Sequence, residues 1–240
     1  MAAVYSVSRG YARMRILVVF EKADTLKYIG HLDLMRALQR AFRRSGLPVA
    51  YSMGFNPHML VTFASALSVG TVGLREIMDV KLSESCDMAE FTSALTRAVP
   101  PGITVKETIT IGDNHPAPMA QLYAASYDVK VLLSQNEPMH AAIAAINDAP
   151  SILIDRKTKK GLKKIDIKPF ILSLNASYAE DAACIHMCLA HREGAACKPD
   201  EIVTELRRLN GLPQDCSCKI TRTALWGLDG KNELAALERI

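Results

Sequence analysis

Arg15-Ile-Leu-Val-Val-Phe20 is followed, after a short loop, by Leu32-Asp-Leu-Met-Arg-Ala-Leu-Gln-Arg-Ala-Phe-Arg-Arg-Ser45, and these two segments decide the fold of the N-terminal half. The first is a short apolar run rich in β-branched residues, which is typical of a buried strand. In the second, apolar residues recur at steps of three and four, which predicts a helix with one buried face. Gly46 and Pro48 end this helix, because glycine favours a left-handed cap and proline cannot continue a helix.

Five further segments complete the first half. We expect extended segments at residues 49–53, 59–63 and 76–82, a second helix at residues 88–99 and a last strand at residues 103–111. The prolines and glycine at residues 100–102 stop the second helix. Apart from one additional extended segment before the second helix, the order is β, α, β, β, α, β, which is the order of a ferredoxin-like unit.

The same order of elements recurs in the second half. Extended segments are expected at residues 127–133, 152–155, 164–173, 184–191 and 218–226, and helices at residues 139–147 and 200–209. The sequence therefore predicts an α+β protein with two tandem ferredoxin-like (βαββαβ) halves and antiparallel sheets. We expect a flexible leader at residues 1–13, a first domain at 14–112, a linker at 113–124, a second domain at 125–228 and a tail at 229–240.

The composition is that of an ordinary globular protein. Of the 240 residues, 49% are hydrophobic and 22% are charged, and the formal net charge is +4. Aromatic residues make up only 6%, which disfavours a platform that stacks many bases. The sequence has no apolar run of about 18 residues, so we expect no membrane span. The six cysteines form no CxxC pair, which favours free thiols in a reducing cytoplasm.

Arginines dominate one flank of the first predicted helix. Their spacing places three or four guanidiniums on the exposed side, opposite the apolar face, with only Asp33 as a nearby acid. A guanidinium can bind phosphate oxygens with two parallel hydrogen bonds. A solvated helix face would also explain the pattern, but such faces usually include glutamate, and none occurs here. The predicted RNA contacts on this helix are Arg36, Arg40, Arg43 and Arg44.

A polar loop and a basic hairpin tip extend the predicted interface. In the loop Ser52-Met-Gly-Phe-Asn-Pro-His58, a plain turn explains Gly54 and Pro57, whereas Ser52, Asn56 and His58 are candidates for contact with bases or ribose. Six of the nine residues from Arg156 to Lys164 are cationic, and Gly161 suggests a hairpin tip. Such a cluster is either a solvated tip or a site for a polyanion. We expect phosphate contacts from Lys157, Lys159, Lys160, Lys163 and Lys164.

Isolated polar residues offer weaker candidates for catalysis or metal binding. His31 or His58 could act as a general base, with Lys22 stabilising negative charge, although such residues more often cap a helix or pack. Cys184, His186 and Cys188 would share one strand face and could begin a zinc site, with a further ligand from elsewhere, for instance Cys216 or Cys218. Ordinary half-buried strand residues are the better account, so we expect neither a metal nor a cofactor.

The same stretches resemble the radical SAM-linked protein family, a domain of unknown function found fused to, or encoded beside, B12-binding-type radical SAM proteins. The resemblance covers most of residues 14–227. It rests on Phe20-Glu-Lys22, Tyr28 to Arg36, Ala41 to Pro48 and Ser52 to His58, with shorter matches at Ile165 to Lys168, Lys198 to Glu201 and Thr221-Arg222. A serine often stands in the family where this chain has Gly30. The further family-motif residues are Asp33, Gly54, Pro57, Glu76, Asp79, Asp166, Lys168 and Arg222.

The resemblance implies an accessory protein that works with a radical SAM enzyme, and the family's frequent genomic neighbours include a ribonuclease of the E/G type. We therefore expect a non-catalytic, cytoplasmic RNA-binding protein that acts with such an enzyme in tRNA or rRNA modification or processing. One alternative is a protein-interaction subunit that docks the radical SAM enzyme without RNA. The other is a metal-free RNA-processing enzyme that uses His31 or His58.

Overall fold

The computed structural model describes residues 14–132, 137–158, 161–179, 182–192 and 195–240. Within these ranges the protein is a mixed α/β structure with five α-helices and mostly antiparallel sheets. The chain divides into two compact units. Unit 1 comprises the chain up to Leu122 together with Leu237–Ile240, and unit 2 comprises Tyr123–Ala236. In the described part of the chain, no helix is long and apolar enough to cross a membrane.

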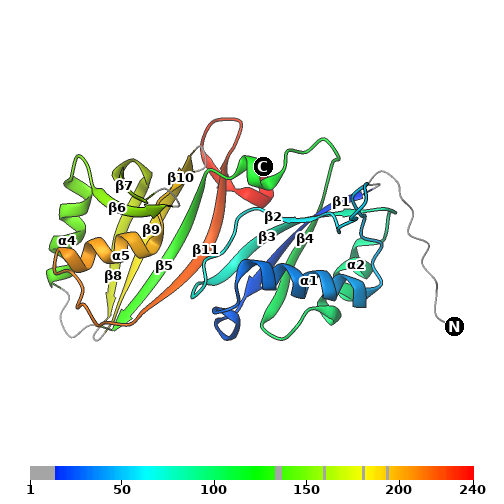
Figure 1. Cartoon of the computed structure of the whole chain (residues 1–240), viewed down its shortest axis with the longest axis horizontal. Coiled ribbons are helices and arrows are strands. Elements are labelled where there is room, and N and C mark those ends of the chain that lie inside the picture. Colours follow the sequence, from blue (N-terminus) through cyan, green and yellow to red (C-terminus); the bar gives the residue numbers. More distant parts are fainter. Residues whose placement is uncertain (1–13, 133–136, 159–160, 180–181, 193–194) are drawn as a thin grey trace. The chain divides into compact units, whose positions relative to one another are not determined.

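Unit 1 is built on four strands that pair in an antiparallel manner. In sheet order its strands are β2 (Val61–Phe63), β3 (Val72–Leu82), β1 (Met14–Lys22) and β4 (Ile103–Ile111). Helix α1 (His31–Ser45) follows β1, and α2 (Met88–Ala98) follows β3. The two helices pack side by side over one face of this sheet (Figure 1). The short helix α3 (Pro118–Gln121) lies in the segment that the sequence predicts as a linker.

Local sequence explains where these helices begin and end. The Asp87 carboxylate accepts hydrogen bonds from the backbone N–H groups of Ala89 and Glu90, which caps the start of α2. Helix α1 ends at Gly46, whose φ of 72° is the left-handed conformation that glycine adopts at lowest cost. The predicted helix at residues 32–45 therefore differs from the observed one by a single residue.

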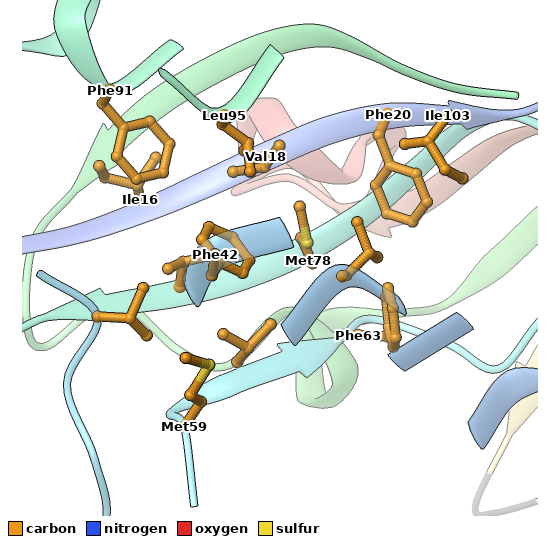
Figure 2. Close-up of a cluster of buried hydrophobic side chains, with 14 of the residues drawn as sticks. Ile16, Val18, Phe20, Phe42, Met59, Phe63, Met78, Phe91, Leu95 and Ile103 are labelled. Carbon is orange, nitrogen blue, oxygen red and sulfur yellow. The ribbon is translucent and has the colours of Figure 1, made fainter. Parts of the chain in front are cut away.

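The core of unit 1 lies between α1, α2 and the sheet. Ile16, Val18 and Phe20 alternate along β1 and meet Phe42 of α1 and other apolar side chains (Figure 2). Each fully buried side chain of this size contributes about 1.5–3 kcal/mol. The remaining members of this cluster include Leu34, Leu38, Met59, Phe63, Met78, Phe91, Leu95 and Ile103. This core fixes which flank of α1 faces away from the protein.

The C-terminal residues complete unit 1. The 3-10 turn at Leu237–Arg239 buries Leu237 and Glu238. Arg75 of β3 forms an ion pair with Glu238 and donates a 3.1 Å hydrogen bond to Glu107 of β4. Arg239 also pairs with Glu107. The segment that the sequence predicts as a tail thus contains residues that belong to the first unit.

Unit 2 contains four long strands that pair in an antiparallel manner. In sheet order its strands are β11 (Cys218–Leu228), β5 (Ala124–Leu132), β9 (Ala182–Arg192) and β8 (Ile171–Ala179). Helix α4 (Glu137–Asp148) packs against β8 and α5 (Pro199–Arg208) (Figure 1). The short strands β10 (Ala195–Ala196) and β12 (Leu234–Ala236) pair with β9 and β11. A separate hairpin is formed by β6 (Leu153–Thr158) and β7 (Gly161–Asp166).

Two predicted strands differ from the observed elements. Residues 49–53 make only isolated bridges, from Val49 to Leu82 and from Tyr51 to Met59. The single extended segment predicted at residues 164–173 is wrong, because it divides into β7, a 3-10 turn at Lys168–Phe170 and β8. Pro169 lies within this turn and has no backbone N–H to donate to a strand ladder. The predicted leader, residues 1–13, lies outside the described residues.

Candidate nucleic-acid interface

Three arginines form an exposed stripe on α1. The buried face of this helix consists of Leu34, Leu38, Ala41 and Phe42. Residues at steps of four and three share one side of a helix, so Arg36, Arg40 and Arg43 lie along the opposite, solvent-facing side. All three are exposed. We call these residues, together with Leu32 one turn before Arg36, the α1 stripe.

Most of the stripe's charge is available to a ligand. Arg36 Nη1 lies 3.1 Å from Asp33 Oδ1, but both side chains are about two-thirds exposed, and such a pair contributes about 0–1 kcal/mol. Within the described part of the chain, neither Arg40 nor Arg43 makes a hydrogen bond or ion pair. Arg44 differs, because its Nη2 donates to the backbone oxygen of Ala98 at 2.6 Å, near the end of α2. The fourth predicted arginine is therefore engaged with the protein.

Two exposed side chains with apolar surface precede the arginines in the chain. Leu32 is 67% exposed and lies one helical turn before Arg36, and Tyr28 is 75% exposed in the turn that precedes α1. The Lys27 ammonium lies 5.3 Å from the centre of the Tyr28 ring. The sequence predictions missed both residues. The sequence feature that could have pointed to this surface is Leu32, an apolar residue that falls on the arginine side of the helix rather than on the apolar side.

Lys22 and His31 support the start of α1. Lys22 is only 1% exposed, and its ammonium donates to the backbone oxygens of Lys27 and Ile29 at 3.2 Å. These oxygens belong to the loop that leads into α1. The His31 ring packs edge-on against Phe63, with ring centres 5.2 Å apart. Lys22 and His31, two of the candidates for catalysis, thus hold the start of α1 in place.

The loop at residues 52–58 is closed by its own ends. Ser52 Oγ lies 2.8 Å from His58 Nδ1, and the backbone N–H of Ser52 donates to the oxygen of His58 at 2.8 Å. Gly54 has a φ of 128°, which a side chain would strain. Asn56 and Pro57 are exposed, as are Met53 and Phe55. Among the described residues, no hydrogen bond or ion pair connects this loop to the arginines of α1.

The basic hairpin lies in unit 2. Lys157, Lys163 and Lys164 are exposed on β6 and β7, whereas Lys159 and Lys160 lie outside the described residues. Arg156 instead pairs with Glu201 of α5, with Nη2 and Oε2 2.6 Å apart. The hairpin is thus anchored by one cation and presents at least three others to solvent.

The remaining family-motif residues are mostly buried. Asp79 receives three hydrogen bonds from the Arg15 guanidinium, at 2.9, 3.1 and 2.6 Å, in a buried ion pair. Glu76 and Arg222 are also buried. Lys168 donates to backbone oxygens at the end of α4. The Asp166 carboxylate accepts from the backbone N–H groups of Ile152 and Lys168, and these bonds lower its pKa. These residues stabilise the fold around the candidate surfaces.

A different polar group lies on the sheet of unit 2. The ligand atoms of Asp128, Cys184 and His186 all lie within 4.8 Å of one another, an arrangement that could hold a metal ion. Cys188, which the sequence places on the same face, is not part of this group. Cys216 and Cys218 lie elsewhere in the unit with their sulfurs 3.8 Å apart, and burial together with Cys216 raises the pKa of Cys218 to about 11. The sequence predictions missed Asp128, because only the pairing of β5 with β9 brings it to His186.

Comparisons with known proteins give a family and little more. A family model described as "Uncharacterized protein conserved in bacteria (DUF2344)" matches residues 15–199. No curated protein matches the sequence. Among solved structures, an unknown protein from Galdieria sulphuraria is 13% identical, with 87% of this chain and 98% of that chain covered and a TM-score of 0.26. A candidate glycine cleavage system transcriptional repressor is 11% identical, with 86% and 95% covered and a TM-score of 0.21. At these TM-scores the likeness carries no argument.

Proposed function

This chain belongs to the family of uncharacterized proteins conserved in bacteria (DUF2344), and we propose that it binds RNA through the α1 stripe. The observation that supports the proposal is the exposure of Arg36, Arg40 and Arg43. They are exposed on one side of a helix whose opposite side is locked into the core. A phosphate backbone offers the regular negative charge that such a row of guanidiniums binds.

The neighbouring apolar residues support RNA over a simple anion. Tyr28 presents an exposed ring in the turn that precedes α1, and a base that stacks on an aromatic ring gains about 1–3 kcal/mol. The phosphate contacts would position the RNA, and the ring would favour an unpaired base. In unit 2, the lysines of the β6–β7 hairpin offer sequence-independent phosphate contacts of their own.

The strand orders support the proposed fold family. Unit 1 has the sheet order β4-β1-β3-β2, and unit 2 has the equivalent order β11-β5-β9-β8. A ferredoxin-like unit places its last strand beside its first and its second strand at the far edge, which is the order in each unit. We therefore propose two tandem ferredoxin-like units, the second with the β6–β7 hairpin inserted after its first helix.

A second candidate function is the docking of a protein partner. Phe55 is 105% exposed and Met53 is 74% exposed, on a loop held closed by Ser52 and His58. Exposed aromatic and methionine side chains on a rigid loop are typical anchors of protein interfaces. We propose that this tip contacts a radical SAM enzyme, as the resemblance of residues 20–58 to the radical SAM-linked family suggests. The two functions are compatible, because the RNA would then be presented to the docked enzyme.

The enzymatic alternative has less support. His58 is held by Ser52, and His31 packs on Phe63. A general base must reach the proton that it removes. Cleavage of bound RNA that is lost in a His31→Ala or His58→Ala variant would nevertheless establish this alternative.

The deciding experiment measures binding of the whole protein to total small RNA at several salt concentrations. We expect log affinity to fall linearly with log salt. The variant Arg36→Ala/Arg40→Ala/Arg43→Ala should lose most of the affinity, and its salt slope should be smaller by about 2, since each phosphate contact to a single strand contributes about 0.7.

A charge-matched control distinguishes binding at the α1 stripe from non-specific attraction of RNA by the positive charge of the whole protein. The variant Lys106→Ala/Arg208→Ala/Lys231→Ala removes the same number of charges from other elements and should bind nearly as well as the wild type. The proposal fails if folded wild-type protein does not bind at low salt, or if both variants bind alike. In that case, a Phe55→Ala variant in pull-downs with the radical SAM enzyme tests the docking function.

A further inference from the structure

The strands of unit 2 place three potential metal ligands on one sheet face. Asp128 of β5 lies directly opposite His186 of β9 in the antiparallel register. Cys184 is two residues from His186 on the same strand, so its side chain points to the same face. The alternate residues Val129, Ile185 and Met187 are buried on the other face. The ligand-bearing face is thus the more accessible one, with Asp128 and His186 34% and 40% exposed.

We propose that Asp128, Cys184 and His186 form a binding site for a divalent metal ion, with Zn²⁺ as the preferred ion. The set combines a thiol, an imidazole and a carboxylate, which are the side chains that zinc takes as ligands. The inference is independent of RNA binding, since the site and the α1 stripe lie in different units. It also revises the ligand set that the sequence suggests, with Asp128 in place of Cys188.

The distances between the ligand atoms lie within about 1 Å of those that a small tetrahedral ion requires. His186 Nδ1 lies 2.7 Å from Asp128 Oδ1 and 4.0 Å from Cys184 Sγ. Zinc bonds of about 2.3 Å to sulfur and about 2.0–2.2 Å to nitrogen or oxygen require ligand atoms roughly 3.3–3.6 Å apart. Side-chain movements of about 1 Å therefore convert the observed cluster into a coordination shell, without a change in the strands.

Ser177 of β8 supplies the outer partner that metal-bound histidines usually have. Its hydroxyl lies 2.9 Å from His186 Nε2. When Nδ1 binds a metal, Nε2 carries the proton, and this N–H donates a hydrogen bond to Ser177 Oγ. A hydroxyl can both donate and accept, so Ser177 can also serve the metal-free imidazole, in which Nδ1–H donates to Asp128. The ring orientation is therefore fixed before a metal arrives.

The charge of the three ligands also fits a dication. The Asp128 carboxylate and a Cys184 thiolate together neutralise two positive charges. Burial and the nearby Asp128 carboxylate raise the pKa of the Cys184 thiol, so metal binding must displace a proton, and affinity must rise with pH. A cavity of about 460 Å³ adjoins Cys184 and Ser177 and is otherwise lined by residues that include Lys130, Tyr178 and Lys219. This cavity gives access for a water molecule or a small ligand as the fourth ligand.

A serine nucleophile is the competing interpretation of the same atoms. Asp128, His186 and Ser177 form hydrogen bonds in the order found in serine hydrolases. That interpretation gives Cys184 no role, although its sulfur lies near the imidazole nitrogen that faces Asp128. The metal interpretation accounts for all four side chains.

The test is titration of the whole reduced protein with Co²⁺, which gives a thiolate-to-cobalt absorption band, followed by Zn²⁺ competition and calorimetry. We expect one ion per chain. Cys184→Ser should abolish the band, and Asp128→Asn should weaken binding by at least about tenfold. Cys188→Ser, from the same strand face, is the matched control and should bind like the wild type. The double variant Cys216→Ser/Cys218→Ser removes the other close thiol pair and should also retain the band.

Three results would overturn the proposal. They are no band with folded wild-type protein, a band that survives Cys184→Ser, and a band that is lost only in the Cys216/Cys218 double variant. Ser177→Ala provides a further readout and should weaken binding by about 10–100-fold. Covalent labelling of Ser177 by a fluorophosphonate in metal-free protein would instead establish the serine nucleophile.

Discussion

At the scale of single residues, Lys22 shows why a charged side chain is hard to assign from sequence. It ends an apolar strand and could equally face solvent or a substrate. In the structure it continues the inward alternation of Ile16, Val18 and Phe20, and its ammonium meets backbone oxygens of the next loop. The buried ammonium is stabilised by these acceptors, which no local pattern reveals because they depend on the path of the loop.

We predict that Lys22→Met destabilises unit 1. Methionine keeps an apolar stem of similar length but leaves the oxygens of Lys27 and Ile29 without this donor. The expected loss in the free energy of unfolding is roughly 1–3 kcal/mol, measured by urea denaturation. Lys27→Met is the control, because the Lys27 pair with Asp24 is partly exposed and contributes about 0–1 kcal/mol. Equal stability of both variants would contradict a structural role for Lys22.

At the scale of elements, hydrophobic periodicity predicted the features that depend on one segment alone, which are the helix ranges and their exposed sides. The helices at residues 31–45 and 88–98 match the expected ranges to within a residue. The exposed arginines of α1 follow from the same period. Features that depend on the pairing of two segments were not predicted. The register of β5 against β9 places Asp128 opposite His186, and this register cannot be read from the sequence of either strand alone. The division of residues 164–173 likewise depends on Asp166, whose side chain binds the backbone on both sides of the hairpin.

The junction of β6, β7 and the following turn should depend on the Asp166 carboxylate. Its pKa is lowered in the folded protein, so its contribution is present above the unfolded pKa of about 3.9 and is lost as the pH falls through the folded pKa. We predict faster hydrogen exchange at the Ile152 and Lys168 amides in Asp166→Ala. Asp166→Asn retains a neutral hydrogen-bond acceptor, so its hydrogen-exchange rate at these amides should lie between those of the wild type and Asp166→Ala. Because the amide does not titrate, the contribution of this side chain should not be lost as the pH falls. Wild-type exchange rates in the alanine variant would rule out the proposed link.

At the scale of the whole molecule, each unit has its own set of paired strands, but the chain does not divide at a single point. Unit 1 takes in Leu237–Ile240, beyond the last strand of unit 2. The sequence suggested a simple succession of two domains and a tail, because amphipathic patterns do not report which distant segment completes a core. Arg75, Glu107 and Glu238 form the ionic part of this closure.

We predict that Glu238→Ala loosens unit 1 in spite of its distance along the chain. Glu238 is buried and Arg75 is partly exposed, so the expected loss is about 1–3 kcal/mol in the free energy of unfolding. Hydrogen exchange should accelerate in β3 and β4 while the amides of β5 and β9 keep their rates. A uniform acceleration over both units would show that the closure is not specific to unit 1.

The discontinuity of unit 1 has a consequence for the order of events on the ribosome. Domains usually begin to fold as they emerge, at a synthesis rate of about 5–20 residues per second. The strands and helices of unit 1 are made first, yet Leu237 and Glu238 emerge only after all of unit 2 has been translated. The nascent first unit must therefore wait on the order of ten seconds for its final residues, with part of its surface uncovered. A chaperone that binds nascent chains would find its target in this interval.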